Sequence, residues 1–220
     1  MMFNENIGQD VCTSVEIPGE GYVYRYDAFA DTLTPAAHEI DLCLAPYESA
    51  VFVVSETELE CTGEACGQIT ERNSGKYGER ELPEAWTVTY ADSLSYPNRT
   101  EEVPLTGLDC VENIAGWDNK CGTLRYETKL DASAGEETIL DLGETYETAE
   151  VFVNGKSAGV RICKPYRFDL TGLLQDGEND LAVEVTNTLG TAVRDALSHY
   201  LVIEPFGVQG PARLLVRDKK

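Results

Sequence analysis

Paired acidic residues are the first candidates for chemistry in this chain of 220 residues. They occur as Glu101-Glu102 and Glu136-Glu137, among others. Retaining glycoside hydrolysis needs two carboxyl groups about 5 Å apart, held in a cleft. Adjacent residues on a strand point to opposite faces, and these runs lie in predicted turns. The acidic runs therefore indicate solvated surface rather than a catalytic pair.

Other catalytic arrangements have no support in the sequence. Its two histidines, His38 and His199, stand alone, so a nucleophilic triad has no support. An H-E-x-x-H zinc motif is also missing from the sequence. We therefore predict no catalytic residues within this chain.

Aromatic rings next to polar side chains are the second kind of candidate. Such a ring stacks on the apolar face of a sugar, while neighbouring carboxylate, amide or guanidinium groups bind its hydroxyls. Trp117 and Asp118, in a loop that follows Gly116, have this composition. The alternative, that Trp117 packs inside the domain, stays open. The residues that we predict to contact a carbohydrate are Trp117, Asp118, Arg161, Tyr166, Asn187, Arg194 and Tyr200.

The seven cysteines are odd in number and mostly isolated, which argues against a disulfide framework. We expect reduced thiols, as in a cytoplasmic protein. Cys61 and Cys66 are separated by four residues, unlike the usual two-residue zinc knuckle, and whether they pair stays open.

No metal or cofactor is predicted. Asp176, Asn179 and Asp180 offer oxygen ligands of the kind that calcium prefers. Their spacing is not that of an EF-hand, and a polar turn explains them equally well.

Charge limits the partners. Seventeen basic and 39 acidic residues give a formal net charge of −22, which repels nucleic acid and anionic lipid. No apolar run approaches the length of a membrane span, and no signal peptide is recognisable, so we expect a cytoplasmic protein without nucleic-acid or membrane partners. Because the chain begins directly with a predicted strand, we expect it to be a fragment of a longer protein.

The elements that must position these side chains are almost all strands. Short β-rich or alternating segments are separated by Gly, Pro, Asn and Asp turns, and Asn154-Gly155 is typical of a two-residue hairpin. The best helical candidate is 190–200, and 170–174 fits one short turn. In the first part of the chain, the predicted strands are 1–4, 11–17, 21–29, 39–44 and 50–54.

The order of features from residue 86 to residue 216 resembles the galactose-binding-like jelly-roll accessory domain of multidomain glycoside hydrolases. It is especially similar to domains of the β-galactosidase/β-glucuronidase and α-L-rhamnosidase families. The segments that carry this resemblance are, in order, GTLRY, LDLGETYETAEVFVNGKSAGV, PYRFDL, DGENDLAVEVTN and FGVQGPARLL. The first 55 residues, with FNE and LAPYESAVF, are similar to the β-rich segment before that jelly roll in rhamnosidase-like enzymes.

The resemblance implies an all-β chain, in which a galactose-binding-like jelly-roll β-sandwich follows the end of a second β-sandwich. We predict the part of a β-sandwich over 1–55, a connector over 56–84 and the jelly roll over 85–217. The implied function is that of a non-catalytic carbohydrate-binding or structural accessory region, whose partners are carbohydrate and an upstream catalytic domain of the same enzyme. Three alternatives remain open: a carbohydrate-binding module that works on its own, a purely structural or protein-interaction β-sandwich, and, least favoured, a complete small enzyme.

Overall fold

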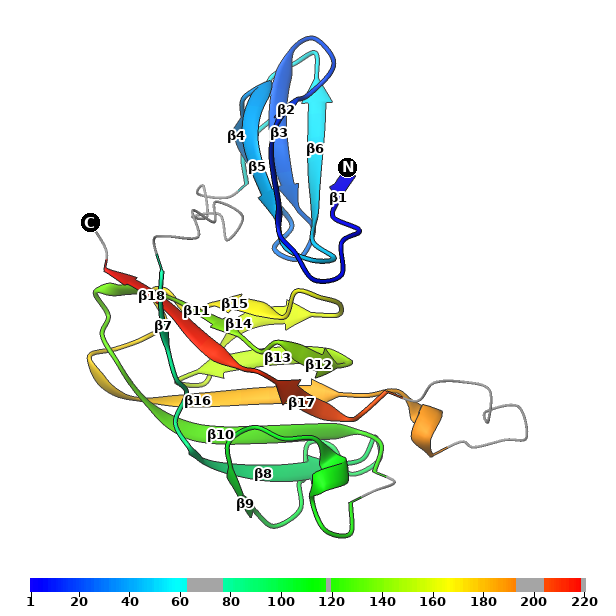
Figure 1. Cartoon of the computed structure of the whole chain (residues 1–220), viewed down its shortest axis with the longest axis vertical. Helices are drawn as coiled ribbons and strands as arrows, with labels where there is room; N and C mark the ends of the chain where they lie inside the picture. Colours follow the sequence, from blue (N-terminus) through cyan, green and yellow to red (C-terminus); the bar gives the residue numbers. More distant parts are fainter. Residues whose placement is uncertain (63–76, 118–119, 193–203, 219–220) are drawn as a thin grey trace. The chain divides into compact units, whose positions relative to one another are not determined.

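Two compact units make up the chain in the computed structural model: a smaller unit, Met1–Lys76, and a larger unit, Tyr77–Lys220 (Figure 1). The structure describes residues 1–62, 77–117, 120–192 and 204–218. Strands dominate both units, which confirms the predicted all-β class.

The smaller unit contains a four-stranded and a two-stranded antiparallel sheet. The first sheet has the order β1 (Met2–Phe3), β6 (Ser49–Ser55), β3 (Tyr22–Asp27) and β4 (Thr32–Ala36). The second pairs β2 (Val11–Glu16) with β5 (Glu39–Leu44). Strand β4 was not predicted because it contains Pro35. Its place at the edge of its sheet explains how the proline is tolerated, since an edge strand leaves one side of its backbone unpaired.

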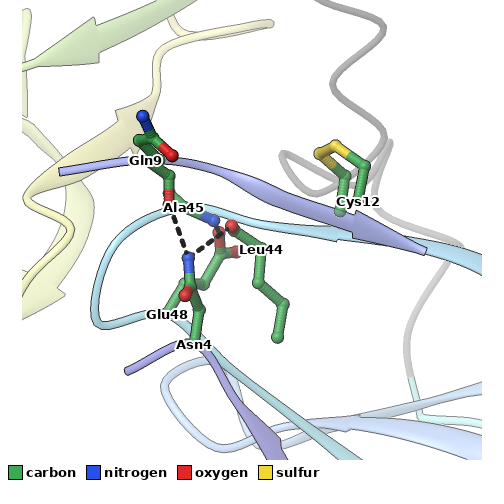
Figure 2. The surroundings of a disulfide bond; sticks show 7 residues. Asn4, Gln9, Cys12, Leu44, Ala45 and Glu48 are labelled. Atoms are coloured by element: carbon green, nitrogen blue, oxygen red, sulfur yellow. Dashed lines mark hydrogen bonds between the residues drawn. A yellow bond between two sulfur atoms is a disulfide. The ribbon is translucent and has the colours of Figure 1, made fainter. Parts of the chain in front are cut away.

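A disulfide joins β2 to β5, and this corrects the prediction of reduced thiols. Cys12 and Cys43 lie directly opposite each other in the register of the two strands, with their Cα atoms 3.9 Å apart (Figure 2). The sequence did not predict this pair, because the number of cysteines is odd and because Cys12 and Cys43 are 31 residues apart in sequence. Cys61, Cys110, Cys121 and Cys163 are free thiols. Cys66, and with it the question of a Cys61–Cys66 pair, lies outside the described residues.

A buried asparagine connects the start of the chain to the end of β5. Asn4 is 4% exposed, and its Nδ2 donates to the carbonyl oxygens of Leu44 at 2.9 Å and Gln9 at 3.0 Å (Figure 2). Its Oδ1 accepts from the backbone N–H of Asn6 at 2.9 Å. One side chain thus satisfies three backbone groups, which matters because a buried unpaired backbone group is costly.

The larger unit is a β-sandwich. Its six-stranded sheet has the order β14 (Lys156–Arg161), β13 (Thr148–Val153), β16 (Gly177–Thr186), β10 (Thr123–Ala132), β8 (Ala85–Ala91) and β9 (Val103–Thr106) (Figure 1). Its four-stranded sheet has the order β15 (Arg167–Asp169), β11 (Glu136–Asp141), β18 (Arg213–Asp218) and β7 (Gly78–Arg80). A short pair, β12 (Glu144–Tyr146) with β17 (Gly207–Gly210), completes it. The predicted jelly-roll β-sandwich is therefore confirmed.

The core of the larger unit contains inward-pointing residues that alternate along its long strands. Leu124, Tyr126 and Leu130 of β10 point inward and are at most 3% exposed, as residues two apart on a strand share a face. Phe168 of β15 and Leu214 of β18 belong to the same buried cluster. The intervening residues of the six-stranded sheet lie on its other face, called here the outer face.

The predicted hairpin at Asn154-Gly155 is confirmed between β13 and β14. Both turn residues have positive φ, 51° and 78°, as a type I′ turn requires. Asn154 also donates from Nδ2 to Asn179 Oδ1 at 2.8 Å, and its Oδ1 accepts from the Asp180 N–H at 3.0 Å. The hairpin is therefore also bonded to the start of β16.

Several short elements differ from the sequence prediction. Strand β7 lies inside the predicted connector 56–84 and pairs with β18. Strands β9, β12 and β17 have three or four residues each, too few for a periodic pattern to reveal. Residues 193–200 of the predicted helix lie outside the described residues, and a 3-10 turn covers Leu189–Thr191. No helix in the described part of the chain is long and apolar enough to cross a membrane.

Candidate functional site

Polar side chains form a row across the outer face of the six-stranded sheet. Glu150 of β13 lies opposite Glu184 of β16, which lies opposite Arg125 of β10, which in turn lies opposite Thr89 of β8. Residues directly opposite each other in an antiparallel pair have Cβ atoms about 4.5–5.5 Å apart. The row therefore places two carboxylates and a guanidinium side by side.

Glu184 is the centre of this row. It is 7% exposed, and its Oε1 accepts from Arg125 Nη1 at 2.9 Å and from Arg99 Nη2. Tyr96 donates its hydroxyl to Glu184 Oε2 at 3.4 Å. Arg99 also lies over the Tyr96 ring, 5.3 Å from its centroid. These contacts bind the loop between β8 and β9 to the outer face of the sheet.

Arg125 is held by a second carboxylate. Its Nε donates to Glu127 Oε1 at 2.8 Å. Burial alone would lower the pKa of Arg125, but the hydrogen bonds to Glu127 and Glu184 outweigh it and raise that pKa above its ordinary value. The guanidinium therefore stays charged.

A cavity of 480 Å³, called here the outer-face cavity, opens beside Glu184. Tyr96, which is 50% exposed, and the carboxylate of Glu150 are on its wall. The hydroxyls of Thr123 and Thr186 also face it and lie 2.9 Å from each other. The described residues that line it are Ser93, Tyr96, Cys121, Gly122, Thr123, Glu150, Glu184, Thr186, Asn187, Thr188 and Leu189.

One end of the cavity is fixed by a pair of hydrogen bonds. Asn187 Oδ1 accepts from the Gly122 N–H at 2.9 Å, and the Asn187 N–H donates to the Gly122 carbonyl at 3.1 Å. Gly122 has φ of 148°, and a Cβ at this position would lie 2.2 Å from the carbonyl oxygen of Ala91. Only glycine allows this approach of β8 to the start of β10.

Among the residues predicted to contact carbohydrate, Asn187 is the one that lines this cavity in the described part of the chain. Trp117 is half-buried against the core and lies 5.9 Å, centroid to centroid, from the Tyr90 ring. Lys120 Nζ lies over both rings, 4.3 Å from the Tyr90 centroid and 5.6 Å from that of Trp117. Trp117 thus packs partly against the core, and its contact with a sugar stays a prediction. Asp118 lies outside the described residues.

Arg161 and Tyr166 are placed elsewhere. Arg161, on β14, lies over the Phe168 ring at 5.5 Å and donates to the Val160 carbonyl at 2.9 Å. Tyr166 is 5% exposed and donates its hydroxyl to the Glu147 carbonyl. Burial raises the pKa of Tyr166 to about 12, and its ring offers no open face to a sugar. Arg194 and Tyr200 lie outside the described residues.

The turn considered for calcium is occupied by its own hydrogen bonds. Asn179 is 1% exposed, and its Oδ1 accepts from the Gln175 N–H at 2.8 Å as well as from Asn154. Asp176 Oδ1 accepts from the Ala134 N–H at 2.9 Å. Within the described ranges, no group of three or more His, Cys, Asp or Glu side chains is placed to hold a metal ion.

A second hollow, of 630 Å³, lies beside Trp86. Trp86 is 3% exposed and donates from Nε1 to the Pro83 carbonyl at 2.6 Å, so its ring is part of the core. Charged side chains of both signs line the hollow, among them Glu79 and Arg213, which pair at 2.8 Å. The outer-face cavity is the better candidate because it has a half-exposed aromatic ring.

Sequence reasoning missed Tyr96, Glu150 and Glu184. A signal was available in the charged residues in the middle of apolar strands. Glu184 interrupts the run LAVEV, and Arg125 interrupts TLRY, each at an outward position. Opposite charges at such positions of neighbouring strands indicate a polar network on a sheet face. The loop that brings Tyr96 over the sheet gave no comparable signal.

Comparison with known proteins shows that the chain is similar to parts of longer proteins. No family model matches the chain. Over 111 residues, or 48% of this chain, it is 33% identical to a putative beta-glucuronidase from Formosa agariphila, of which the match covers 10%. A solved rhamnosidase from Novosphingobium sp. PP1Y matches over 98% of this chain and 22% of its own, with 22% identity and a TM-score of 0.66. A beta-glucuronidase from Ruminococcus gnavus matches over 65% of this chain and 29% of its own, with 15% identity and a TM-score of 0.51.

These matches confirm the resemblance to glycoside hydrolases of the β-glucuronidase and rhamnosidase kinds. They also show how partial it is, because the chain spans a tenth of the curated relative and about a fifth of the rhamnosidase. The chain resembles a part of such enzymes, with an all-β sandwich fold.

Proposed function

We propose that this chain is a non-catalytic accessory region of a glycoside hydrolase and that its larger unit binds carbohydrate in the outer-face cavity. The observation that carries the second part is the meeting of a half-exposed tyrosine, two carboxylates and two threonine hydroxyls at one cavity. Its volume of 480 Å³ lies within the range of about 300–1,000 Å³ that is usual for small-molecule sites.

The chemistry of these groups suits a sugar. A tyrosine ring packs against the C–H face of a pyranose, and carboxylates and hydroxyls bind its hydroxyl groups. Arg99 Nε is buried without a hydrogen-bond partner in the described part of the chain, and so is Thr89 Oγ1, which lies opposite Arg125 in the strand register.

The ion pairs around Glu184 favour a second candidate, a purely structural role. Arg99 and Arg125 bind Glu184 directly and hold the loop between β8 and β9 on the sheet. Under this alternative the cavity is a by-product of that attachment, and the region serves only to pack against other domains.

The partner that we propose is a catalytic barrel in the same enzyme, upstream of this chain. The much greater length of the similar enzymes supports it. Glu184 is an ion-pair partner of two guanidiniums, so we propose no catalytic function for the Glu150–Glu184 pair. The cytoplasmic location stays a prediction, and the Cys12–Cys43 disulfide argues for an oxidising compartment instead.

The decisive experiment is a calorimetric or glycan-array screen of the purified chain with the variant Tyr96→Ala. We expect binding of at least one mono- or oligosaccharide and its loss in Tyr96→Ala, because a stacked aromatic contributes a large part of such affinity. Tyr22→Ala is the matched control, since Tyr22 is 47% exposed but belongs to the smaller unit.

The other outcomes separate the candidates. Absence of binding to every glycan, from a chain with intact secondary structure, would favour the structural role. Binding that survives Tyr96→Ala but is lost in Trp117→Ala would move the site to the loop predicted from the sequence.

A further inference from the structure

The outer-face cavity has an uneven distribution of charge. Its described lining contains two carboxylates, of Glu150 and Glu184, and no lysine or arginine. The two guanidiniums nearby, of Arg99 and Arg125, are engaged by Glu184, and that of Arg125 also by Glu127. Three carboxylates thus meet two guanidiniums in this cluster, which leaves a net charge of one negative unit.

Glu150 carries that excess charge. It lies opposite Glu184 in the strand register, on the side of β16 away from Arg125. Its Oε1 accepts from Ser157 Oγ at 2.7 Å, and it forms no ion pair with a described residue. Like charges directly opposite on neighbouring strands repel, so a cation or a neutral donor beside Glu150 is favoured and another anion is disfavoured.

We infer that the outer-face cavity selects uncharged sugars and rejects uronic acids and other anionic sugars. This inference rests on the proposed function, because it names the class of carbohydrate bound at the proposed site. A neutral pyranose donates its hydroxyls to the Glu150 carboxylate, which accepts hydrogen bonds strongly. A uronate places a second negative charge within a few ångströms of Glu150, inside a chain that already carries a net charge of −22.

Two of the similar proteins are beta-glucuronidases by name. A region that accompanies a catalytic domain and prefers neutral sugars would contact a different residue of a polysaccharide from the one that is cleaved. The charge of the cavity, rather than the fold, would then decide which residue that is.

The test is a calorimetric comparison of matched glycosides at neutral pH: methyl galactoside against methyl galacturonate, and methyl glucoside against methyl glucuronate. We expect each neutral sugar that binds to do so at least about tenfold more tightly than its uronate, from the repulsion of two unit charges a few ångströms apart. Raising the salt concentration should narrow this ratio, because the cavity is open to solvent.

The variant Glu150→Gln keeps the shape of the side chain and removes its charge. We expect it to abolish the discrimination, mainly by improving the binding of the uronate. Glu178→Gln is the matched control: the same charge is removed from the far end of β16, where the side chain is 70% exposed. Glu178→Gln should leave the ratio of the affinities for the neutral sugar and its uronate unchanged.

The possible failures are distinguishable. A uronate that binds as tightly as its neutral partner, or more tightly, would overturn the inference and leave carbohydrate binding intact. Discrimination that persists in Glu150→Gln would also overturn it. If no sugar of either kind binds the folded chain, the proposed function fails and the inference fails with it.

Discussion

Different interactions stabilise the larger and the smaller unit of this chain. The larger unit has a cluster of 22 buried apolar residues in the described part of the chain, contributed by both of its sheets. Among the described residues of the smaller unit, the corresponding cluster has three members, Leu42, Leu44 and Ala50, with four partly buried neighbours. The smaller unit adds the Cys12–Cys43 disulfide and the buried hydrogen bonds of Asn4.

The difference follows from size. A small unit buries a smaller fraction of its apolar surface than a large one, so its hydrophobic stabilisation is marginal. Covalent and polar cross-links then contribute a larger share of the stability. We therefore expect the larger unit to depend mainly on apolar packing and the smaller unit mainly on cross-links.

The largest expected effect is in the core of the larger unit. Phe168 is fully buried there, and Phe168→Ala should lower the free energy of unfolding by about 3–5 kcal/mol, from lost burial and the cavity left behind. Tryptophan fluorescence during denaturant unfolding measures it, because both tryptophans, Trp86 and Trp117, belong to this unit.

The matched control is Ile162→Ala, at a side chain that is 66% exposed, for which we expect a change within about 0.5 kcal/mol. Hydrogen exchange of β2 and β5 should stay unchanged in both variants. If these strands lost protection to the same extent as the larger unit, the two units would form one cooperative structure and the comparison would fail.

The second effect concerns the disulfide. The double variant Cys12→Ala, Cys43→Ala should destabilise the smaller unit by about 2–4 kcal/mol, because the cross-link restricts the unfolded chain. Hydrogen exchange of the smaller unit reports the loss, and the fluorescence transition of the larger unit should not move.

Treatment of the unmodified chain with a thiol reductant should reproduce this effect, and Cys61→Ala, at an exposed free thiol, should not. A chain that shows the same exchange with and without reductant would remove the disulfide from the explanation of this unit's stability.

The third effect is smaller and also confined to the smaller unit. Asn4→Ala leaves the carbonyls of Leu44 and Gln9 and the N–H of Asn6 without their side-chain partner. Unpaired buried groups cost about 1–3 kcal/mol. Thermal unfolding monitored by hydrogen exchange measures this loss of stability. Asn6→Ala should cost less, because Asn6 is exposed and water replaces its bonds. Equal losses in the two variants would contradict the importance of burial at Asn4.

The fold was largely predictable from the sequence, and the exceptions have physical causes. Alternation and turn residues identified the long strands and the Asn154-Gly155 hairpin, because those signals are local. Strand β4 was hidden by Pro35, and β7 by its three residues in a polar segment. The disulfide depends on the register of β2 and β5, which the sequence does not specify by spacing alone.

The candidate site was harder to predict than the fold. The predicted residue Asn187 lines the candidate cavity, but Tyr96 reaches Glu184 across 88 positions of sequence, and Arg99 across 85. Tertiary packing determines where a loop lies on the face of a sheet, and so do close backbone approaches such as that of Gly122 to Ala91. Trp117 had the right composition for a sugar platform, yet its ring packs on Tyr90.

The smallest expected effect is a dependence of the smaller unit on pH, through His38. Its two ring nitrogens lie 3.1 Å from the Ile17 carbonyl oxygen and 3.0 Å from that of Gly21. Both contacts are hydrogen bonds only when both nitrogens carry a proton. These backbone acceptors, first Ile17 and then Gly21, with a smaller contribution from Glu16, raise the pKa of His38 above its ordinary value of 6.5, although burial opposes the shift.

Because the pKa of His38 is raised in the folded state, protonation of His38 stabilises the smaller unit, and this contribution is fully present below pH 6.5. The contribution is lost as the pH rises through the pKa of His38 in the folded state. Hydrogen exchange of β2 and β5 should therefore become faster, beyond the intrinsic effect of pH, as the pH rises above 6.5. An NMR titration gives the pKa of His38 directly. In the His38→Ala variant, the additional acceleration of hydrogen exchange should be absent. A measured pKa at or below 6.5 would show that the imidazole ring is held by one carbonyl at most, and that the cross-links of this unit act independently of pH.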